Sequence, residues 1–295
     1  MSKRKHNSFD STARLNNLTY DYYYRRLMNI AVSTFEWKNL PDTIDPRFLE
    51  LQLYTKGRCI FFKDEDMGDG EYLSLACTLG GTLNVYNIPT ERTAYASNGY
   101  QRKLNEDNSV VIFHNYLHTS PAVDIDMYAL RLQEIQRTID VNVHAQKTPV
   151  IVLCDENQRL SMVNLMMNYE GNVPLIFGDK HLNPNDIKSI NIEAPFVAKE
   201  LEELRVQTWN DALTYLGISN VNVTKKERLI TDEVQRNMGG TLASRYSPLD
   251  MRQQACKQIN DMFGLNISVD YREDLKAYDK QIVDETDDGG DELNE

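Results

Sequence analysis

Two stretches of the chain place apolar residues at helical spacing. In residues 126–146 the apolar positions follow at steps of four, three, four and four, and they are Tyr128, Leu132, Ile135, Ile139 and Val143. Residues 196–217 carry two stripes, one of Val197, Leu201, Leu204, Thr208, Ala212 and Tyr215, the other of Val206, Trp209, Leu213 and Leu216. These periods predict two helices of about 20 residues, each roughly 30 Å long. A helix with two apolar stripes has partners on two sides, which in an oligomer include neighbouring subunits.

The insert between these helices, residues 147–195, is bracketed by Pro149 and Pro195, and proline is disfavoured inside helices. Its pattern predicts a strand at 149–153, a short helix at 160–169 and a second strand at 175–177. We therefore expect a small α/β module held between the ends of the two long helices.

The first part of the chain changes from helical to strand-like patterning. Apolar spacing predicts a helix over residues 20–37, and the turn at 39–46 is placed to start a short helix through Leu53. Strand-like runs follow at 59–62, 72–77, 82–86 and 110–113. The acidic loop 64–70 lacks the glycine and glutamate of a calcium-binding loop at the required positions, so we interpret it as a solvated turn.

The last part of the chain is predicted to contain a loop, a helix and a strand. The polar stretch 235–247 includes two adjacent glycines, which is typical of a mobile loop. Ser247 suits an N-cap and Pro248 suits the first helical position, so a final helix is expected to run to Phe263. An edge strand is expected at 265–269. The whole pattern indicates an α+β fold.

Charge is distributed unevenly along the 295 residues. The net charge of −12 excludes a protein that wraps nucleic acid over its whole surface. Residues 1–14 nevertheless carry Lys3, Arg4, Lys5 and Arg14 against one acid, whereas the residues from Asp284 onward carry seven acids and no base. This asymmetry suggests a polyanion partner for the N-terminal arm, and we expect the tail to be solvated and disordered.

The sequence contains no pattern that addresses the protein to a membrane. No apolar run approaches the ~18 residues of a membrane span, and the N-terminus has no apolar signal core. We therefore expect a protein that is made in the cytoplasm and has no membrane partner.

Motifs for catalysis and cofactor binding are missing from the sequence. It has no phosphate-binding glycine loop, dinucleotide fingerprint or nucleophile motif. His114 and His118 stand four apart but lack the glutamate of a helical zinc motif. The four cysteines have no zinc or redox spacing, and we interpret them as reduced, mostly buried thiols: Cys59, Cys77, Cys154 and Cys256. We expect no enzyme activity, no metal and no cofactor.

Residues 22–26, Tyr-Tyr-Tyr-Arg-Arg, combine aromatic rings with cations. Such a run can stack on the bases of a nucleic acid. The interpretation that we favour is a helix that packs its rings against the core, because aromatic side chains are mostly buried.

Five blocks of sequence resemble one known family. They are FEWKNLPDTIDPRFLE at 35–50, AQKTPV at 145–150, NYEGN at 168–172 with Pro174, Ile176 and Phe177, KKER at 225–228 with TDEV at 231–234, and an end segment with Ala255, Cys256, Ile259, Asn260 and Gly264-Leu265-Asn266. In this order they are similar to the portal protein, also called the upper collar or head–tail connector, of the small phi-29-like podoviruses. The resemblance is weaker over residues 57–125.

The resemblance implies a portal fold in a ring-forming oligomer. Residues 1–18 would be a basic flexible arm and residues 19–125 a wing of helices and strands. The two long helices, 126–146 and 196–217, would be stem helices that flank a clip at 147–195. The remaining segments would be a wing segment with a channel loop at 218–247, a C-terminal helix and strand of the wing at 248–272, and an acidic tail at 273–295.

The resemblance also implies function and partners. Portal proteins of this family form a homododecamer at one capsid vertex of the virion, and double-stranded DNA is packaged and ejected through the ring. The implied partners are the packaging ATPase, a packaging RNA, the major capsid and scaffolding proteins, and the lower collar or tail protein.

The same resemblance assigns candidate binding residues. The basic arm of the family contacts the packaging RNA, and Lys3, Arg4 and Lys5 occupy the equivalent place. Two bore-facing lysines of the family's second stem helix match Glu200 and Arg205 here, with Lys199 next to the first. We therefore expect DNA-facing cations in the channel at Lys199, Arg205, Lys225, Lys226 and Arg228. For each of them, an ion pair on an exposed face is the alternative.

Two rival functions stand beside the portal. One is an enzyme of the packaging machinery, a nuclease or NTPase, and the missing motifs count against it. The other is a nucleic-acid-binding adaptor of the packaging complex that acts through the basic N-terminal arm.

Overall fold

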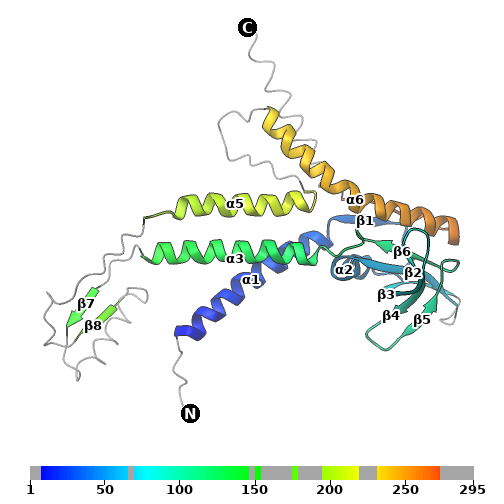
Figure 1. Cartoon of the computed structure of the whole chain (residues 1–295), viewed down its shortest axis with the longest axis horizontal. Helices are drawn as coiled ribbons and strands as arrows, with labels where there is room; N and C mark the ends of the chain where they lie inside the picture. Colours follow the sequence, from blue (N-terminus) through cyan, green and yellow to red (C-terminus); the bar gives the residue numbers. More distant parts are fainter. Residues whose placement is uncertain are drawn as a thin grey trace, which may run out of the picture. The chain divides into compact units, whose positions relative to one another are not determined.

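The computed structural model describes residues 8–65, 70–145, 150–153, 175–178, 195–218 and 231–272 (Figure 1). The chain divides into two compact units, one made of Met1–Arg131 with Thr208–Glu295 and the other of Leu132–Gln207. Helices and antiparallel sheets together form the first unit, so the predicted α+β class is confirmed.

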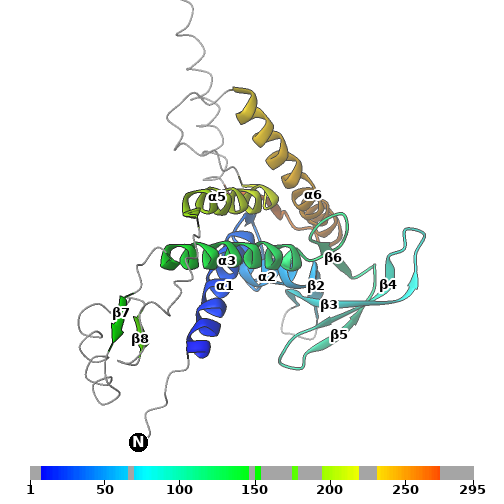
Figure 2. The same cartoon turned by 60° about the vertical axis from the view of Figure 1, so that its left-hand side comes forward.

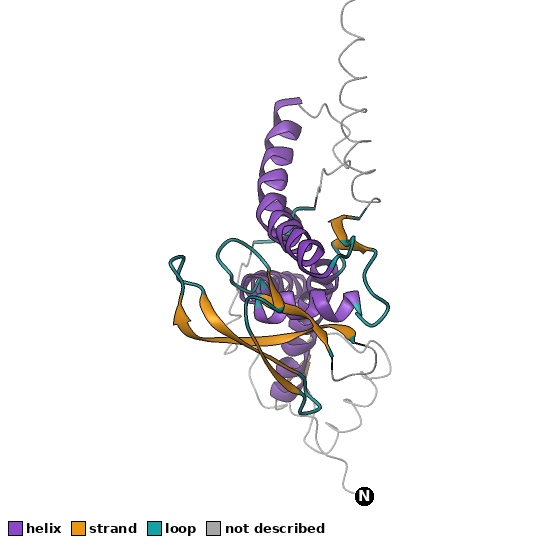
Figure 3. Ribbon diagram, turned by 90° about the vertical axis from the view of Figure 1, so that its right-hand side faces the viewer, coloured by secondary structure: helices purple, strands orange, loops and turns teal. Residues whose placement is uncertain are grey.

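The first unit contains a five-stranded antiparallel sheet (Figure 3). Its order is β5-β4-β3-β2-β6, and its strands are β2 (Arg58–Asp64), β3 (Glu71–Leu83), β4 (Pro89–Tyr95), β5 (Gln101–Leu104) and β6 (Ser109–Phe113). Phe61 of β2 packs in a core with residues of α2 (Pro46–Lys56) and α6 (Thr231–Phe263), whereas Phe62 packs in a second core with Cys77 and Leu104. Both faces of β2 are buried, which explains its continuous apolar run.

The strand predictions are correct for the apolar runs and wrong elsewhere. Strands β4 and β5, with sequences PTERTAY and QRKL, lie outside the predicted runs because they are mostly polar. The predicted strand 82–86 is wrong, since β3 ends at Leu83 and a turn follows. The side-chain oxygen of Asn84 accepts hydrogen bonds from the backbone N–H groups of Tyr86 and Ile88, which turns the chain toward β4.

Asp64 belongs to strand β2 and not to the solvated turn that the sequence predicts. It is only 1% exposed and accepts hydrogen bonds from the hydroxyl of Tyr100 and from the guanidinium of Arg102. A buried carboxylate requires such partners, because desolvation of an unpaired charge is costly. Residues 66–69 of the same predicted turn lie outside the described residues.

Helix α1 spans Ser8–Val32, so it begins inside the predicted flexible arm and ends before residue 37. The segment Phe35–Lys38 is strand β1, which pairs antiparallel with β9 (Ser268–Tyr271). The helix prediction is wrong here because burial alternates along FEWK. A four-residue alternation beside a long helix is too short to be separated from it by periodicity.

Helix α2 confirms the short helix predicted after the turn at 39–46. Its N-cap is Asp45, whose side chain accepts a hydrogen bond from the backbone N–H of Arg47, and Pro46 lies in the first turn. Gly57 ends the helix with φ of 71°, and a Cβ at this position would lie 2.7 Å from the backbone of Thr119. Only glycine fits this C-cap without strain.

Helix α6 runs without interruption from Thr231 to Phe263, so the predicted loop is wrong over its helical residues. The glycines at 239 and 240 and Pro248 all lie within the helix. Ser247 is no N-cap, because it lies in the interior of α6, where its hydroxyl accepts a hydrogen bond from the backbone N–H of Tyr116. The second half of α6 is buried in the main core, and this packing outweighs the low helix propensity of glycine and proline.

The second unit contains the end of α3 (Ala122–Ala145), the start of α5 (Ala198–Tyr215) and a parallel pair of strands. The strands are β7 (Val150–Leu153) and β8 (Leu175–Gly178). Both long helices and both strands of the insert are therefore confirmed as elements. The predicted helix at 160–169 lies outside the described residues.

Candidate functional site

Helix α3 has an apolar surface on two sides. Ile125 and Ala129 are fully buried in the first unit. Val123, Met127 and Leu130, which lie four and three residues apart and so share a face, are 75%, 41% and 49% exposed. We call these three residues the α3 stripe. No described residue of the same chain covers this stripe.

Tyrosine–carboxylate hydrogen bonds hold the first turns of α3 to two other helices. The hydroxyl of Tyr20 on α1 donates to Asp126, and the hydroxyl of Tyr215 on α5 donates to Asp124 at 2.6 Å. The rings of Tyr128 and Tyr215 also lie 6.0 Å apart. Burial and the bond to Asp126 raise the pKa of Tyr20 to about 12, and burial and the bond to Asp124 raise the pKa of Tyr215. Both hydroxyls therefore stay protonated donors near neutral pH.

The tyrosine–arginine run of α1 packs against α5. Tyr23 is 3% exposed and its ring lies 6.4 Å from the ring of Trp209. The guanidinium carbon of Arg26 lies 4.3 Å from the centre of the Trp209 ring, a cation–π contact. Core packing of the rings is confirmed for Tyr23, while Arg26 is exposed and Tyr22 is 55% exposed.

In the second unit, Asn142 joins the end of α3 to the start of α5. Its side-chain N–H donates to the carbonyl of Pro195 at 2.9 Å, and its side-chain oxygen accepts from the backbone N–H of Val197 at 3.2 Å. One amide thus satisfies a carbonyl and an N–H that precede the first turn of α5.

The two described channel candidates, Lys199 and Arg205, both lie on α5 but on different sides of it. They are six residues apart, which is about 240° around a helix with 3.6 residues per turn. Lys199 is exposed, whereas Arg205 forms a two-point ion pair with Glu202, whose N–H···O distance from Nε is 2.8 Å. The hydrogen bond from Arg205 lowers the pKa of Glu202. Much of the charge of Arg205 is therefore neutralised within the helix.

The remaining predicted site residues lie outside the described residues. They are Lys225, Lys226 and Arg228 of the channel loop and Lys3, Arg4 and Lys5 of the arm. Their assignments stay predictions. Of the predicted site residues, only Lys199 and Arg205 can be placed, and they lie on different sides of α5.

The surface charge of the long helices is acidic. Helices α3 and α5 each carry four carboxylates and two arginines or lysines, which leaves each with a net charge of −2. Such helices do not attract a polyanion, because fixed cations are what release counterions from nucleic acid on binding.

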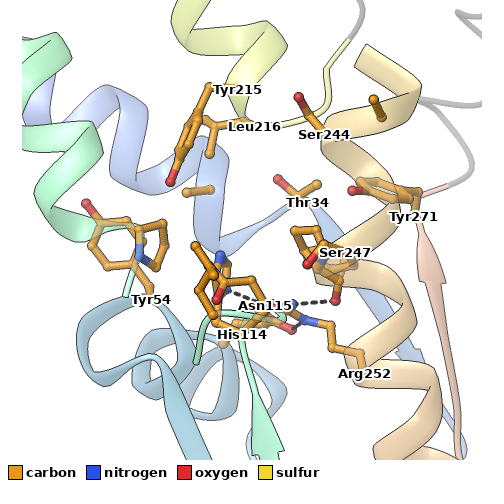
Figure 4. Close-up of a pocket in the computed structure, with 17 residues that line it drawn as sticks. Thr34, Tyr54, His114, Asn115, Tyr215, Leu216, Ser244, Ser247, Arg252 and Tyr271 are labelled. Atoms are coloured by element: carbon orange, nitrogen blue, oxygen red, sulfur yellow. Dashed lines mark hydrogen bonds and ion pairs between the residues drawn. The ribbon is translucent and has the colours of Figure 1, made fainter. Parts of the chain in front are cut away.

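A pocket of about 250 Å³ lies beside a buried ion pair in the first unit (Figure 4). Arg252 of α6 donates from Nε and Nη2 to both carboxylate oxygens of Glu50 on α2, at 2.9 and 2.7 Å. Its Nη1 donates to the carbonyls of Pro248 and His114, and Trp37 Nε1 donates to Glu50 at 2.8 Å. The pair is 1% and 4% exposed at its side chains and is fully hydrogen-bonded.

This pocket has the composition of a structural junction and not of a catalytic centre. Burial, and then the charge of Arg252, lower the pKa of His114 well below its usual value, so the imidazole is neutral. His118, the other half of the weak metal pattern, stacks on the ring of Phe113 at 3.6 Å. The described residues contain no cluster of three or more His, Cys, Asp or Glu that could hold a metal ion.

Comparison with known proteins identifies the family. The family model of the phage connector, GP10, matches residues 4–276. The chain belongs to the phage connector family. The connector is therefore a head–tail connector, a structural protein of the virion located at a capsid vertex, and not an enzyme. Among the described helices of this connector, none is long and apolar enough to span a membrane.

Two solved structures have a low sequence identity to the connector. A chain in the portal and tail of native bacteriophage P68 is 16% identical with a TM-score of 0.49, and the match covers 92% of the connector and 93% of that chain. A chain in the neck of an empty GTA particle is 10% identical with a TM-score of 0.40, and the match covers 95% of the connector and 87% of that chain.

Sequence reasoning missed the residues that hold the connector's helices together. Glu50 and Arg252 are 202 positions apart, and Tyr20 and Asp126 are 106 apart. No local spacing marks such pairs. The one available signal was a set of charged residues inside apolar stretches, where a partner of opposite charge is required.

Proposed function

We propose that the connector assembles into a homododecameric ring at one capsid vertex and that double-stranded DNA enters and leaves the capsid through the channel of this ring. The observation that carries the proposal is the exposed α3 stripe in a chain of the connector family. A closed ring needs two different surfaces on each subunit that complement each other. An apolar stripe that its own chain leaves in solvent is suited to one of these surfaces.

The acidic charge of the described helices supports the role of a conduit. A bore lined with many cations would hold DNA, since each neutralised phosphate adds to affinity. Helices α3 and α5 have net negative charge, and Arg205 is paired with Glu202. A channel formed by them would guide DNA by repulsion with a few placed cations, for which we propose the exposed Lys199 and the loop residues Lys225, Lys226 and Arg228. Arg205, on another side of α5, would act on DNA only by exchanging Glu202 for a phosphate.

The proposed partners follow from the position at the vertex. The ring would contact the major capsid and scaffolding proteins during assembly and the lower collar or tail protein afterwards. The packaging ATPase and a packaging RNA would dock through the basic arm with Lys3, Arg4 and Lys5. Residues 147–195 would be the clip, and the two long helices would be the stem.

Procapsids test this proposal directly. They are assembled from the capsid and scaffolding proteins of the same virus, with and without the connector, and are supplied with the packaging ATPase, the packaging RNA and ATP. The connector-containing particles are expected to protect genome-length DNA from nuclease. Equal protection in particles that lack the connector would contradict the conduit.

A further inference from the structure

The hairpin formed by β3 and β4 extends beyond the rest of its sheet (Figure 2). Strand β3 pairs with β2 only through residues 71–75 and with β4 from Ala76 onward, and β4 pairs with β5 only from Arg92. Residues 80–91 therefore have no other described strand beside them. The pairing register shifts between Gly80 and Leu83, and Gly81 has φ of 77°, as in a β-bulge that redirects the tip.

The tip of this hairpin is apolar and exposed. Leu83, Val85 and Tyr86 are 59%, 89% and 80% exposed. The turn itself is well fixed, because Asn84 accepts two backbone hydrogen bonds and its own N–H donates to the carbonyl of Ile88 at 2.9 Å. A two-stranded extension gains little stability alone in water, and three large apolar side chains on it are suited to a partner.

The same unit contains an apolar groove between the sheet and α6. It has a volume of about 790 Å³, within the range of ligand-binding clefts, and Val111, Met251 and Met262 contribute apolar surface. Gln254 and Gln258 of α6 contribute polar groups, and Arg92, Glu106 and Asp261 add charged groups to the lining. Methionine side chains adapt to the shape of an inserted group, so the groove can accept large apolar side chains.

The hairpin cannot fill this groove within its own chain. Asn84 and Ile88 form part of the groove lining, but the tip residues Val85 and Tyr86 do not, and they are almost fully exposed. Each chain thus presents a protruding apolar surface and a receiving apolar surface that it leaves open. A head-to-tail contact needs such an unequal pair, whereas a two-fold dimer would bury one surface against itself.

We infer that the hairpin tip of one connector subunit, Leu83, Val85 and Tyr86, docks in the groove between the sheet and α6 of the next subunit around the ring. This contact rests on the proposed ring and adds to it a second set of residues, independent of the α3 stripe. The bulge at Gly80–Leu83 sets the direction of the tip, and the two methionines form the seat.

Disulfide trapping tests the contact. The double variant Val85→Cys/Gln258→Cys is made in a Cys154→Ser background. The other three native cysteines, Cys59, Cys77 and Cys256, are kept because they are buried and burial raises their thiol pKa values to about 12, 11 and 12. Mild oxidation of the assembled ring is expected to give a ladder of covalent multimers on non-reducing gels. The matched control is Val85→Cys/Ser97→Cys, which places the second cysteine on the exposed β4–β5 turn and should stay monomeric on the gel.

Three results would contradict the hairpin contact without contradicting the proposed ring. They are an uncrosslinked double variant, a crosslink that stays within one chain, and an equal ladder in the control. A second variant, Val85→Ser/Tyr86→Ser, should lower the yield of rings at least several-fold with unchanged circular dichroism, and an undiminished yield would also overturn it. If the unmodified connector forms no ring at all, that result contradicts the proposed function itself and not only the hairpin contact.

Discussion

A buried ion pair between Glu50 and Arg252 joins α2 to α6 in the first unit. Both groups are buried, and each is the only oppositely charged partner that the described residues give the other. Glu50→Gln leaves the guanidinium charge buried without its partner, so we expect a loss of about 3–5 kcal/mol in the free energy of unfolding. Urea unfolding followed by tryptophan fluorescence measures it, since Trp37 and Trp209 both lie in this unit.

The matched control for this variant is Asp21→Asn. It breaks the exposed pair between Asp21 and Arg25, whose side chains are 46% and 74% exposed. The expected loss is about 0–1 kcal/mol. Equal effects of the two substitutions would mean that the buried pair contributes no more than a surface pair.

His114 makes the stability of the first unit depend on pH. Burial and Arg252 hold its pKa in the folded protein well below 6.5, so the unfolded chain takes up the proton first. The stability is therefore fully present above pH 6.5 and falls as the pH drops below it. We expect the urea midpoint to decrease between pH 7.5 and 5, and to decrease less in His114→Gln. His144→Gln, at the exposed end of α3, is the control and should keep the pH dependence of the unmodified protein.

At the scale of elements, the continuous helix α6 replaces a loop that the sequence predicts. Gly239 lies inside this helix, and a Cβ added there would meet no neighbouring atom within 4 Å. Gly239→Ala should therefore stabilise the protein by about 0.5–1 kcal/mol, the difference in helix propensity. Thermal unfolding measures this gain, and no change would indicate that residue 239 is not helical in solution.

Gly217→Ala is the opposite case and serves as the control. Gly217 has φ of 73°, and a Cβ there would lie 2.6 Å from Cγ of Arg245. Alanine at this position is strained and crowded, so we expect a lower unfolding temperature. A gain at both glycines would mean that the effect reports only on the unfolded chain.

Helices with strong periodicity and apolar strands could be predicted from the sequence, and polar elements could not. In the long helices α3 and α5 and the strands β2 and β6, the apolar pattern within the segment is sufficient to identify the element. Strand β4 is mostly polar, so its composition does not mark it as a strand. It is held in the sheet by its pairing with β3 and β5. The first half of α6 contains two glycines, which disfavour a helix. The segment is helical nevertheless, because the second half of α6 packs in the core.

The candidate site was predictable only as far as the family resemblance extends. Of the cations assigned to the channel, Lys199 is exposed and Arg205 is paired with Glu202. The exposed α3 stripe, in contrast, could not be separated from the buried face by period alone. Tyr128 and Leu132 belong to the predicted face, while Met127 and Leu130 are the exposed residues.

At the scale of the whole molecule, the α3 stripe is expected to control assembly without controlling folding. Met127→Glu/Leu130→Glu adds two charges to an exposed apolar face, so each chain should fold as before and the ring should not form. Size-exclusion chromatography and circular dichroism separate these effects. The control Ser97→Glu places a charge on the β4–β5 turn and should assemble normally, whereas a ring formed by the double variant would remove the stripe from the interface.

The basic arm is expected to bind nucleic acid without contributing to the ring. Deletion of residues 2–7 removes Lys3, Arg4 and Lys5 and leaves helix α1 intact from Ser8. We expect unchanged rings and weaker, less salt-dependent binding of RNA, because fewer phosphates are neutralised. Loss of the ring in this variant would contradict the assignment of the arm.

The most direct test of the proposed ring is the mass of the purified connector in solution, measured together with negative-stain images of the same fraction. We predict a uniform ring with a central hole and a mass twelve times the 34.1 kDa of the chain. A stable monomer or dimer at high concentration would contradict it, because neither can enclose a channel for DNA.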